Sequence, residues 1–304
     1  MKIAKRNILY NEMSRFNTVT LNVDPGEVFQ VETELNTGDW LQSEYDVWSP
    51  EKTSCVNPSS GCIYIEGAKS GHMLSVKILD IKLLDLGYTG FAPGMTPFPD
   101  WIRKKEWGKI ITKTVKIENG YILWSDELKI AIQPMIGLIG TAPAVGVPKN
   151  TENGPFGGNM DIQEVTTGNT IFLPVFVEGG LLHVGDVHAI MGDGEICCAG
   201  GIETRAILKL KVELVSKPKE MTWPRIETPD YIISIGCARP AEDAFRIAVQ
   251  ELIKWMVESY GFTDTDAFLL LGQVLQARCT QFVDPLYTYV AKIQKKFLKS
   301  SQNN

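Results

Sequence analysis

The first three quarters of the chain consist of short runs in which apolar and polar residues alternate. Clear examples cover residues 18–23, 73–81 and 207–214, and Gly, Pro, Asn and Asp separate such runs. A period of two turns every second side chain toward a core and the others toward solvent, which is typical of β-strands. Up to about Cys237, the pattern therefore predicts an all-β body, a sandwich or barrel with one solvated face.

From Pro240 onward the apolar spacing becomes helical. Between Phe245 and Met256, apolar residues recur at intervals of three and four and so form a single stripe. Such a stripe is typical of an amphipathic helix packed on a core, and Gly261 is a residue at which such a helix ends. The sequence predicts a first C-terminal helix that ends near this glycine.

Two more helices are predicted after this one. The hydroxyl of Thr263 can cap a helix whose apolar positions run from Ala267 to Leu275. Pro285 interrupts the pattern, because proline lacks the N–H that a helix interior needs. Residues 287–297 then have the spacing of a short amphipathic helix before a polar tail.

These patterns predict a mainly β fold, with a β-sandwich-like body and C-terminal α-helices packed on it. Residues 1–237 would form the β-rich catalytic body and residues 238–304 the helical C-terminal segment, together making one integrated domain. A chain of 304 residues, 44% of them hydrophobic, is long enough to bury a large core.

Charge and cysteine content narrow the function classes. A net charge of −6 argues against a nucleic-acid surface, which needs clustered Lys and Arg. The N-terminal residues lack the apolar region of a signal peptide, and no apolar stretch reaches the ~18 residues of a membrane span. Six cysteines without a Cys-x-x-Cys pair indicate reduced thiols. We expect a cytoplasmic protein that contacts neither membrane nor nucleic acid.

Most of the plausible chemistry lies between residues 157 and 195. Three polar pairs there share an i, i+2 spacing: Asn159 with Asp161, Asp186 with His188, and Asp193 with Glu195. On an extended strand this spacing turns both side chains to one face, ~7 Å apart. A turn at the glycine before Asp193 would bring the last two pairs toward a common centre. Hard oxygen ligands with a borderline nitrogen suit a divalent metal.

Each of these residues also has a structural interpretation. Asp193 precedes a glycine, as turn residues do, and Asp186 follows one. His188 could be a hydrogen-bonded packing residue, and His183, in an apolar run, is expected to pack or to support the site. Glu66 ends a β-type run and is placed for a strand-end site. Spacing alone leaves both a metal hydrolase and an ordinary set of turns and core residues open.

Four motifs carry a resemblance. Gly-Gly-Asn-Met-Asp at 157–161, Gly-Asp-x-His-Ala-x-x-Gly-Asp-Gly-Glu at 185–195, Tyr-Ile-Glu-Gly-Ala at 64–68 and Gln-Phe-Val-Asp-Pro at 281–285 resemble the acetamidase/formamidase family. The resemblance extends from about Leu21 to Pro285. It implies a mainly β fold with C-terminal helices, self-association, bound zinc or calcium, and hydrolysis of short amides such as formamide or acetamide to carboxylate and ammonia. Cys62 and Met191 depart from the residues common in the family, Pro and Gln.

The residue pattern and the resemblance together suggest a set of metal ligands. Asp161, Asp186 and His188 are the first choices, and Asn159 and Asp193 are close enough in the pattern to be ligands or their partners. Zinc is the expected ion, with calcium as the alternative, because carboxylates with imidazole suit zinc and an all-oxygen subset suits calcium.

The catalytic assignments follow from the same reasoning. A metal would lower the pKa of water and polarise the amide carbonyl. Glu195 or Glu66 would take the water proton and return it to the departing nitrogen. Gly158 and Met191 are expected to contact the substrate, Gly158 through a backbone N–H aimed at the developing oxyanion.

Other readings remain open at this stage. A catalytic cysteine at Cys197 or Cys198 is disfavoured by its apolar context, which raises a thiol's pKa. A lactam or other small-amide hydrolase would use the same metal site, and a non-catalytic, metal-stabilised β-sandwich binding protein would keep the metal without turnover. The apolar residues 136–147 could cover a partner, so we expect a homo-oligomer, a dimer or larger.

Overall fold

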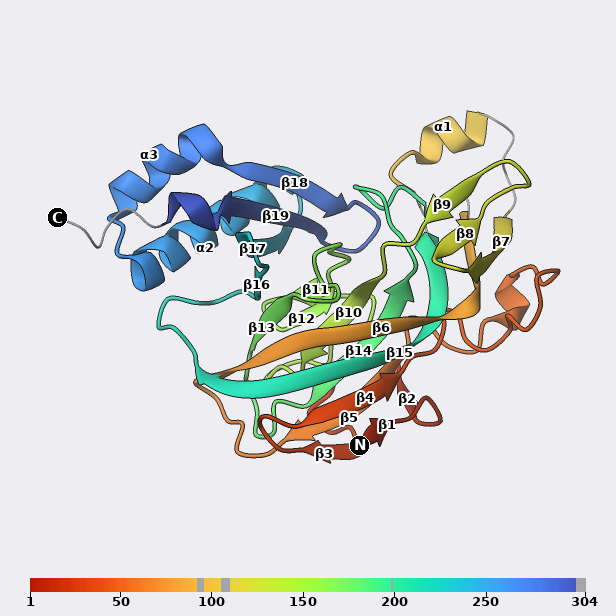
Figure 1. Cartoon of the computed structure of the whole chain (residues 1–304), viewed down its shortest axis with the longest axis horizontal. Helices are drawn as coiled ribbons and strands as arrows, with labels where there is room; N and C mark the ends of the chain where they lie inside the picture. Colours follow the sequence, from red (N-terminus) through yellow and green to blue (C-terminus); the bar gives the residue numbers. More distant parts are fainter. Residues whose placement is uncertain (92–95, 105–109, 198, 299–304) are drawn as a thin grey trace.

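A computed structural model of the chain describes residues 1–91, 96–104, 110–197 and 199–298. Within these residues, nineteen strands pair into one curled, mostly antiparallel half-barrel sheet, and helices α2 and α3 cover one end of it (Figure 1). The predicted mainly β fold with C-terminal helices is confirmed. None of the described helices has the length and apolarity to cross a membrane.

The elements have the following bounds. The first ten strands are β1 (Ile3–Ala4), β2 (Leu9–Tyr10), β3 (Leu21–Val23), β4 (Val28–Glu32), β5 (Ser59–Ile65), β6 (His72–Phe91), β7 (Ile111–Glu118), β8 (Tyr121–Leu123), β9 (Lys129–Ala131) and β10 (Met135–Thr141). The others are β11 (Asn153–Gly154), β12 (Gly157–Asn159), β13 (Thr170–Pro174), β14 (Leu182–His188), β15 (Ala199–Ser216), β16 (Arg225–Glu227), β17 (Tyr231–Ala238), β18 (Gln276–Gln281) and β19 (Tyr287–Gln294). The α-helices are α1 (Pro99–Lys104), α2 (Ala241–Tyr260) and α3 (Asp264–Val274), and 3₁₀ turns lie at Pro50–Lys52 and Lys295–Phe297.

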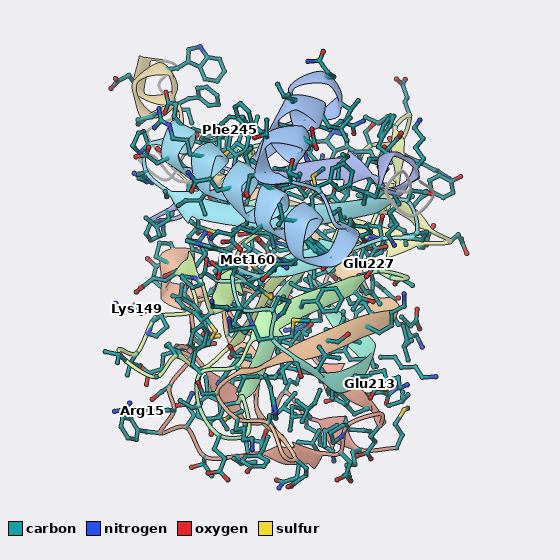
Figure 2. The ribbon with its side chains drawn as sticks, turned by 90° about the vertical axis from the view of Figure 1, so that its left-hand side faces the viewer. Arg15, Lys149, Met160, Glu213, Glu227 and Phe245 are labelled. Carbon is teal, nitrogen blue, oxygen red and sulfur yellow. The ribbon has the colours of Figure 1, made fainter. Side chains whose placement is uncertain are left out.

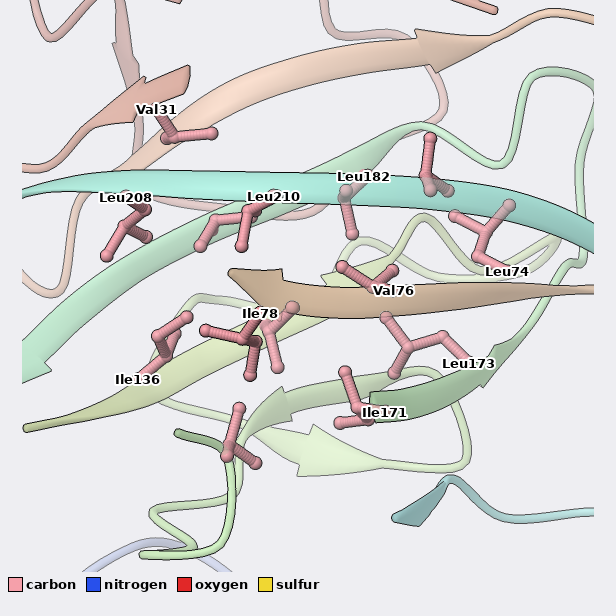
Figure 3. Close-up of a cluster of buried hydrophobic side chains, with 14 of the residues drawn as sticks. Val31, Leu74, Val76, Ile78, Ile136, Ile171, Leu173, Leu182, Leu208 and Leu210 are labelled. Carbon is pink, nitrogen blue, oxygen red and sulfur yellow. The ribbon is translucent and has the colours of Figure 1, made fainter. Parts of the chain in front are cut away.

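Two long strands form the frame of the body. β6 has 20 residues and β15 has 18, and they pair antiparallel along nearly their whole length, from His72 opposite Ser216 to Gly90 opposite Ala199. Both contain the alternating runs seen in the sequence. Their inward side chains meet those of β13 in a fully buried apolar cluster (Figure 3), which includes Leu74, Val76, Ile78, Ile171, Leu173, Leu208 and Leu210. The concave face of the curled sheet therefore holds the main hydrophobic core.

The two predicted C-terminal helices are present with the expected ends. Gly261 terminates α2 in a left-handed conformation with φ of 72°, and the hydroxyl of Thr263 accepts a hydrogen bond from the Asp266 N–H at the start of α3. The buried face of α2 is centred on Ala248 and Leu252. Phe245, at the edge of the predicted stripe, keeps 37% of its surface exposed (Figure 2).

The prediction of a third helix over residues 287–297 is wrong. Residues Tyr287 to Gln294 form β19, which pairs antiparallel with β17 over eight residues and with β18 on its other edge. Most residues of this segment are β-branched or aromatic, and such residues favour a strand when neighbouring strands are available for backbone hydrogen bonding. The C-terminal segment is therefore a layer of strands and helices, joined to the body because β17 also pairs with β16.

This C-terminal layer touches the body at the region of the polar motifs. Gly194 forms a parallel bridge with Gln281, and the Phe282 N–H donates to the Gly194 carbonyl at 3.0 Å. The Thr280 hydroxyl donates to the Met160 carbonyl at 3.3 Å. Figure 2 shows Met160 at the level where the helices meet the sheet. The polar motifs thus lie at the junction of the two layers.

Candidate metal centre

Strand β10 brings the two central motifs together. Its residue Leu138 lies opposite Asn159 of β12 on one side and opposite Gly185 of β14 on the other. Asp161 follows β12 by two residues, and Asp186 follows Gly185, so both carboxylates arrive next to β10 from opposite edges. Asp161 and Asp186 are 25 residues apart in the chain, and the register of β12 and β14 against β10 brings them together.

Asp161, Asp186 and His188 converge on one point. One ligand atom from each lies within 4.8 Å of the other two, and all three side chains are buried. Asp186 Oδ1 lies 3.7 Å from His188 Nε2, closer than the ~7 Å expected of an ideal strand. Asp161 and Asp186 both have left-handed backbone conformations, with φ of 49° and 53°, which are uncommon for residues other than glycine. The local backbone is bent to aim these carboxylates inward.

Gly137 of β10 leaves the space that the two carboxylates occupy. A Cβ at this position would lie 2.3 Å from Asp161 Oδ1 and 2.8 Å from Asp186 Oδ2. The Gly137 carbonyl also accepts the Asp161 N–H at 3.2 Å. Any side chain at residue 137 would push one of the two carboxylates out of the cluster.

Asn159 holds two carboxylates through its amide group. Its Nδ2 donates to Asp161 Oδ2 at 2.8 Å and to Asp284 Oδ2 at 3.0 Å. Its Oδ1 accepts from Asn57 Nδ2 at 3.2 Å. In this arrangement Asn159 positions Asp161, and its own amide oxygen is already used by Asn57.

Glu203 is a neighbour of His188 that the sequence reasoning missed. It lies on β15 directly opposite His188 in the ladder, with Glu203 Oε1 3.2 Å from His188 Nε2. It is as buried as the other members of the cluster. The only local signal was a carboxylate within a β-type run, and such residues are common on solvated faces. The pairing of β14 with β15 turns it into a site residue.

Two further carboxylates complete the cluster. Glu195 is buried, and a Cβ built on Gly200 would lie 2.3 Å from Glu195 Oε1 and 2.7 Å from His188 Cε1, which places Glu195 beside the imidazole. Asp284 arrives from the loop after β18, where the Gln281 side-chain oxygen accepts the Asp284 N–H at 3.0 Å. The late motif at 281–285 contains Asp284, but the sequence reasoning gave this acid no role.

The electrostatics of the cluster favour a bound cation. Burial and the charge of Asp186 raise the pKa of Asp161 to about 7, and burial raises that of Glu203 to about 8. Burial, with the charge of Asp161, raises the pKa of Glu195 and of Asp284 well above the ordinary range. Burial alone would lower the pKa of His188, but Glu203 and Asp186 raise it well above its ordinary value.

Several ligand-type atoms have no hydrogen-bond partner among the described residues. They are Asp161 Oδ1, Asp186 Oδ1, Glu195 Oε2, Glu203 Oε2 and both ring nitrogens of His188. Buried polar atoms are normally satisfied, because each unpaired one costs about 1–3 kcal/mol. Converging ligand atoms from Asp161, Asp186 and His188, with further buried carboxylates beside them, are what a divalent cation requires. The residues present therefore fit a metal ion.

Two of the predicted site residues lie elsewhere. The Asp193 side chain is 63% exposed, and its Oδ1 accepts from Arg278 Nε at 2.8 Å, so it diverges from Glu195 and does not share its face. Glu66 follows the last residue of β5 and accepts a hydrogen bond from Asn22 Nδ2 at 2.8 Å. The first residue of β5, Ser59, is the one that pairs with Gly185 beside the cluster. Seven residues of strand put Glu66 roughly 20 Å from the cluster.

The two predicted substrate contacts are both buried. Gly158 has φ of 93°, and a Cβ there would lie 2.2 Å from the Glu152 carbonyl oxygen, so this position requires glycine for backbone reasons. Met191 is buried and follows β14 on the way to Glu195. Cys197 is half-buried, which raises its pKa, and Cys198 lies outside the described residues.

Comparisons with known proteins agree with this site. The Acetamidase/Formamidase family model matches residues 13–154 and again residues 151–293. A formamidase from Methylophilus methylotrophus is 28% identical over 324 aligned positions, which cover 82% of this chain and 79% of that protein. An acetamidase from Mycolicibacterium smegmatis is 34% identical over 137 residues, but the match covers only 38% of this chain and 34% of that protein.

A solved structure extends the likeness to the full length. The crystal structure of an acetamidase from Bacillus halodurans has a TM-score of 0.91 and 29% sequence identity, and covers 99% of this chain and 100% of that one. Both the family matches and this superposition include the segments that bring Asp161, Asp186 and His188 together. The chain belongs to the Acetamidase/Formamidase family of amidases.

Proposed function

We propose that the protein hydrolyses short linear amides, of the formamide and acetamide type, to a carboxylate and ammonia with the help of a divalent metal ion. The observation that carries this proposal is the buried group of Asp161, Asp186 and His188, whose ligand atoms converge and which includes Asp161 Oδ1, Asp186 Oδ1 and both His188 ring nitrogens without a hydrogen bond in the described chain. Family membership supports the substrate class.

The chain's own residues would divide the work as follows. Asp161, Asp186 and His188 would hold the ion, which when bound would polarise the amide carbonyl and lower the pKa of water. Asn159 would keep Asp161 in place through its 2.8 Å hydrogen bond. Glu203, whose Oε1 lies 3.2 Å from the same His188 Nε2 that faces Asp186, would supply a further carboxylate oxygen beside the ion.

Glu195 is the group best placed to move a proton. Its Oε2 is buried without a hydrogen-bond partner among the described residues, and its carboxylate lies beside His188. We propose that Glu195 takes a proton from water as the new C–O bond forms, and gives it to the amide nitrogen as the C–N bond breaks. Burial raises the pKa of Glu195, which makes its carboxylate a stronger base than an exposed one. Glu66 is too remote for this role.

We further propose that the ion is zinc and that the protein is a homo-oligomer. A set of two carboxylates and one imidazole suits zinc, whereas calcium prefers six or more oxygen ligands. Elemental analysis of the purified protein would identify the ion. Light scattering would give the oligomeric state.

One experiment tests the reaction and the site together. Purified protein is assayed for ammonia release from formamide, acetamide and propionamide, with a small lactam as a fourth substrate, before and after exhaustive chelation. We expect activity on at least one linear amide, loss on chelation and recovery with Zn²⁺. Full activity in the metal-stripped protein would rule out the mechanism, and bound metal without any ammonia release would favour the non-catalytic binding protein.

Matched variants separate the ligands from their neighbours. Asp161→Ala should lose the bound metal, because it removes a convergent carboxylate. Asp193→Ala should keep the metal, because that side chain faces solvent and Arg278. Equal metal loss in both variants would contradict the assignment of Asp161.

A further inference from the structure

Arg278 binds three side chains from two turns outside the metal centre. Its Nη1 and Nη2 donate to the two carboxylate oxygens of Glu164 at 2.9 and 2.6 Å, and Nη2 also donates to Gln163 Oε1 at 2.9 Å. Its Nε donates to Asp193 Oδ1 at 2.8 Å. Gln163 closes the ring, since its Nε2 donates to the same Asp193 oxygen at 3.1 Å.

The partners of Arg278 are neighbours of the site acids in the chain. Gln163 and Glu164 come two and three residues after Asp161, and Asp193 comes two residues before Glu195. The Gly194 N–H, between Asp193 and Glu195, donates to the Thr280 carbonyl of β18, the strand that carries Arg278. One side chain therefore connects the segments that deliver the metal ligand Asp161 and the proton-transfer group Glu195.

We propose that Arg278 is a positioning residue that sets the distance between Glu195 and Asp161 by clamping the two turns to β18. This rests on the proposed function, in which those two groups act on the same bound water. The bond to Glu164 is partly shielded, with 22% of the Arg278 side chain and 16% of that of Glu164 exposed, so it is stronger than a fully solvated pair. The Asp193 side chain is 63% exposed, and its bond to Arg278 is reinforced by the second bond from Gln163.

The geometry of the clamp requires a guanidinium group. Three nitrogens of Arg278 are used at once, in a fork to Glu164 and a lateral bond to Asp193. A lysine ammonium is a point charge that cannot span both carboxylates in this way. Lys292 provides a control within the same network, because its Nζ binds Glu164 at 3.0 Å but has no bond to Asp193 in the described chain.

The test compares Arg278→Ala, Arg278→Lys and Lys292→Met with the unmodified, metal-loaded protein. We expect kcat of Arg278→Ala to fall tenfold or more with KM within about threefold, because small misplacements of reacting groups slow the chemical step. Arg278→Lys should recover only part of the loss, and low-millimolar guanidinium should recover part of it in Arg278→Ala. Lys292→Met should stay within about twofold.

Hydrogen exchange gives a readout that does not depend on turnover. The Gly194 and Glu195 amides are bonded to the Thr280 and Gly192 carbonyls, so the peptide covering residues 192–196 should exchange faster in Arg278→Ala, with metal content unchanged. If Arg278→Ala does not fold, Asp193→Ala removes the tie to the Glu195 turn and leaves the bonds of Arg278 to Gln163 and Glu164 in place. It should show the same faster exchange and a severalfold lower kcat.

Several outcomes would overturn the clamp. They are unchanged kcat and exchange in Arg278→Ala, a change in KM alone, or an equal loss of kcat in Lys292→Met. If the unmodified protein releases no ammonia from any amide, the proposed function fails. The exchange of residues 192–196 then decides the clamp by itself.

Discussion

The two ends of strand β14 each carry a fully buried histidine, and the two differ in every other respect. His183 lies against Tyr10 and bonds Ser59 Oγ at 2.8 Å, and burial lowers its pKa to about 3. His188, five residues further on, faces Asp186 and Glu203, which raise its pKa well above the ordinary value despite its burial. The strand between the two rings is not regularly extended, because Asp186 has a left-handed φ of 53°.

The difference shows how neighbouring strands set the electrostatic environment of a buried histidine. Both rings have lost their water, so desolvation is common to both. What separates them is the set of carboxylates that lies at the His188 end of β14 and not at the His183 end. The sequence interpretation of His183 as a packing residue agrees with its neutral, hydrogen-bonded setting.

The strongest test of this comparison is removal of His188. In His188→Ala we expect kcat/KM to fall on the order of a thousandfold, about 4 kcal/mol, because the variant lacks one of the three proposed metal ligands. Bound metal, measured by elemental analysis, should fall with it. A variant that keeps its metal and most of its activity would show that the two ends of β14 are functionally alike.

The pH dependence of stability should be dominated by the His188 end. In the unfolded chain, Asp161 and Glu203 would have their ordinary pKa values of 3.8 and 4.5. In the folded, metal-free protein their pKa values are about 7 and about 8, so they stay protonated to a higher pH. Raised carboxyl pKa values therefore remove stability as the pH rises across that window. His188, whose pKa is also raised, loses its stabilising charge on the same rise.

We therefore expect the melting temperature of chelated protein to fall by several degrees between pH 5 and pH 8. Added Zn²⁺ should reverse the fall, since a cation favours the deprotonated carboxylates and neutral imidazole. Thermal unfolding at a series of pH values, with and without metal, measures this. A melting temperature that rises over the same range without metal would contradict the raised pKa values.

At the other end of β14, substitution should affect stability alone. His183→Leu keeps similar volume but removes the partner of Ser59 Oγ, so we expect a loss of about 1–2 kcal/mol in the free energy of unfolding. Metal content and kcat should match those of unmodified protein. Elemental analysis, the ammonia assay and denaturant unfolding measure metal content, kcat and stability, and metal loss here would mean that the two ends of β14 are not independent.

The smallest effect is expected from Ser59→Ala. This removes the hydroxyl that bonds His183 Nδ1 and also accepts from Asn150 Nδ2 at 3.1 Å. We expect about 1 kcal/mol of destabilisation with no change in activity. Combining it with His183→Leu should cost less than the sum of the two, because both remove the same hydrogen bond. Full additivity would show that the bond contributes nothing.

Local spacing predicted the part of the site that depends on one strand at a time. Asn159 and Asp161 are bonded to each other, as their i, i+2 spacing indicated, and Asp186 and His188 share a face. The same spacing failed for Asp193, whose exposed side chain bonds Arg278 while Glu195 is buried in the cluster. Each of the three pairs contains a residue with a left-handed φ, so an extended pattern alone does not decide which side chains converge.

Residues brought in by distant pairing could not be found in this way. Glu203 enters through the ladder between β14 and β15, and Asp284 through the docking of β18 on the turn at Gly194. Likewise, the apolar residues in 287–294 fit both a helical spacing and the alternation of a strand. The segment forms a strand because it pairs with the edge of β17. Sequence patterns report local geometry, and register and docking are long-range.

The bridge between Gly194 and Gln281 also has a consequence for the order of folding. The acids of the site span the chain from Asp161 to Asp284, so the cluster cannot be complete until the final strand pair has been synthesised and has docked. Contacts so distant in sequence form late, because their loop-closure entropy must be overcome first. A chain still being translated would form the core of the body well before the site is complete. It would bring all the acids of the proposed metal centre together only near the end of folding.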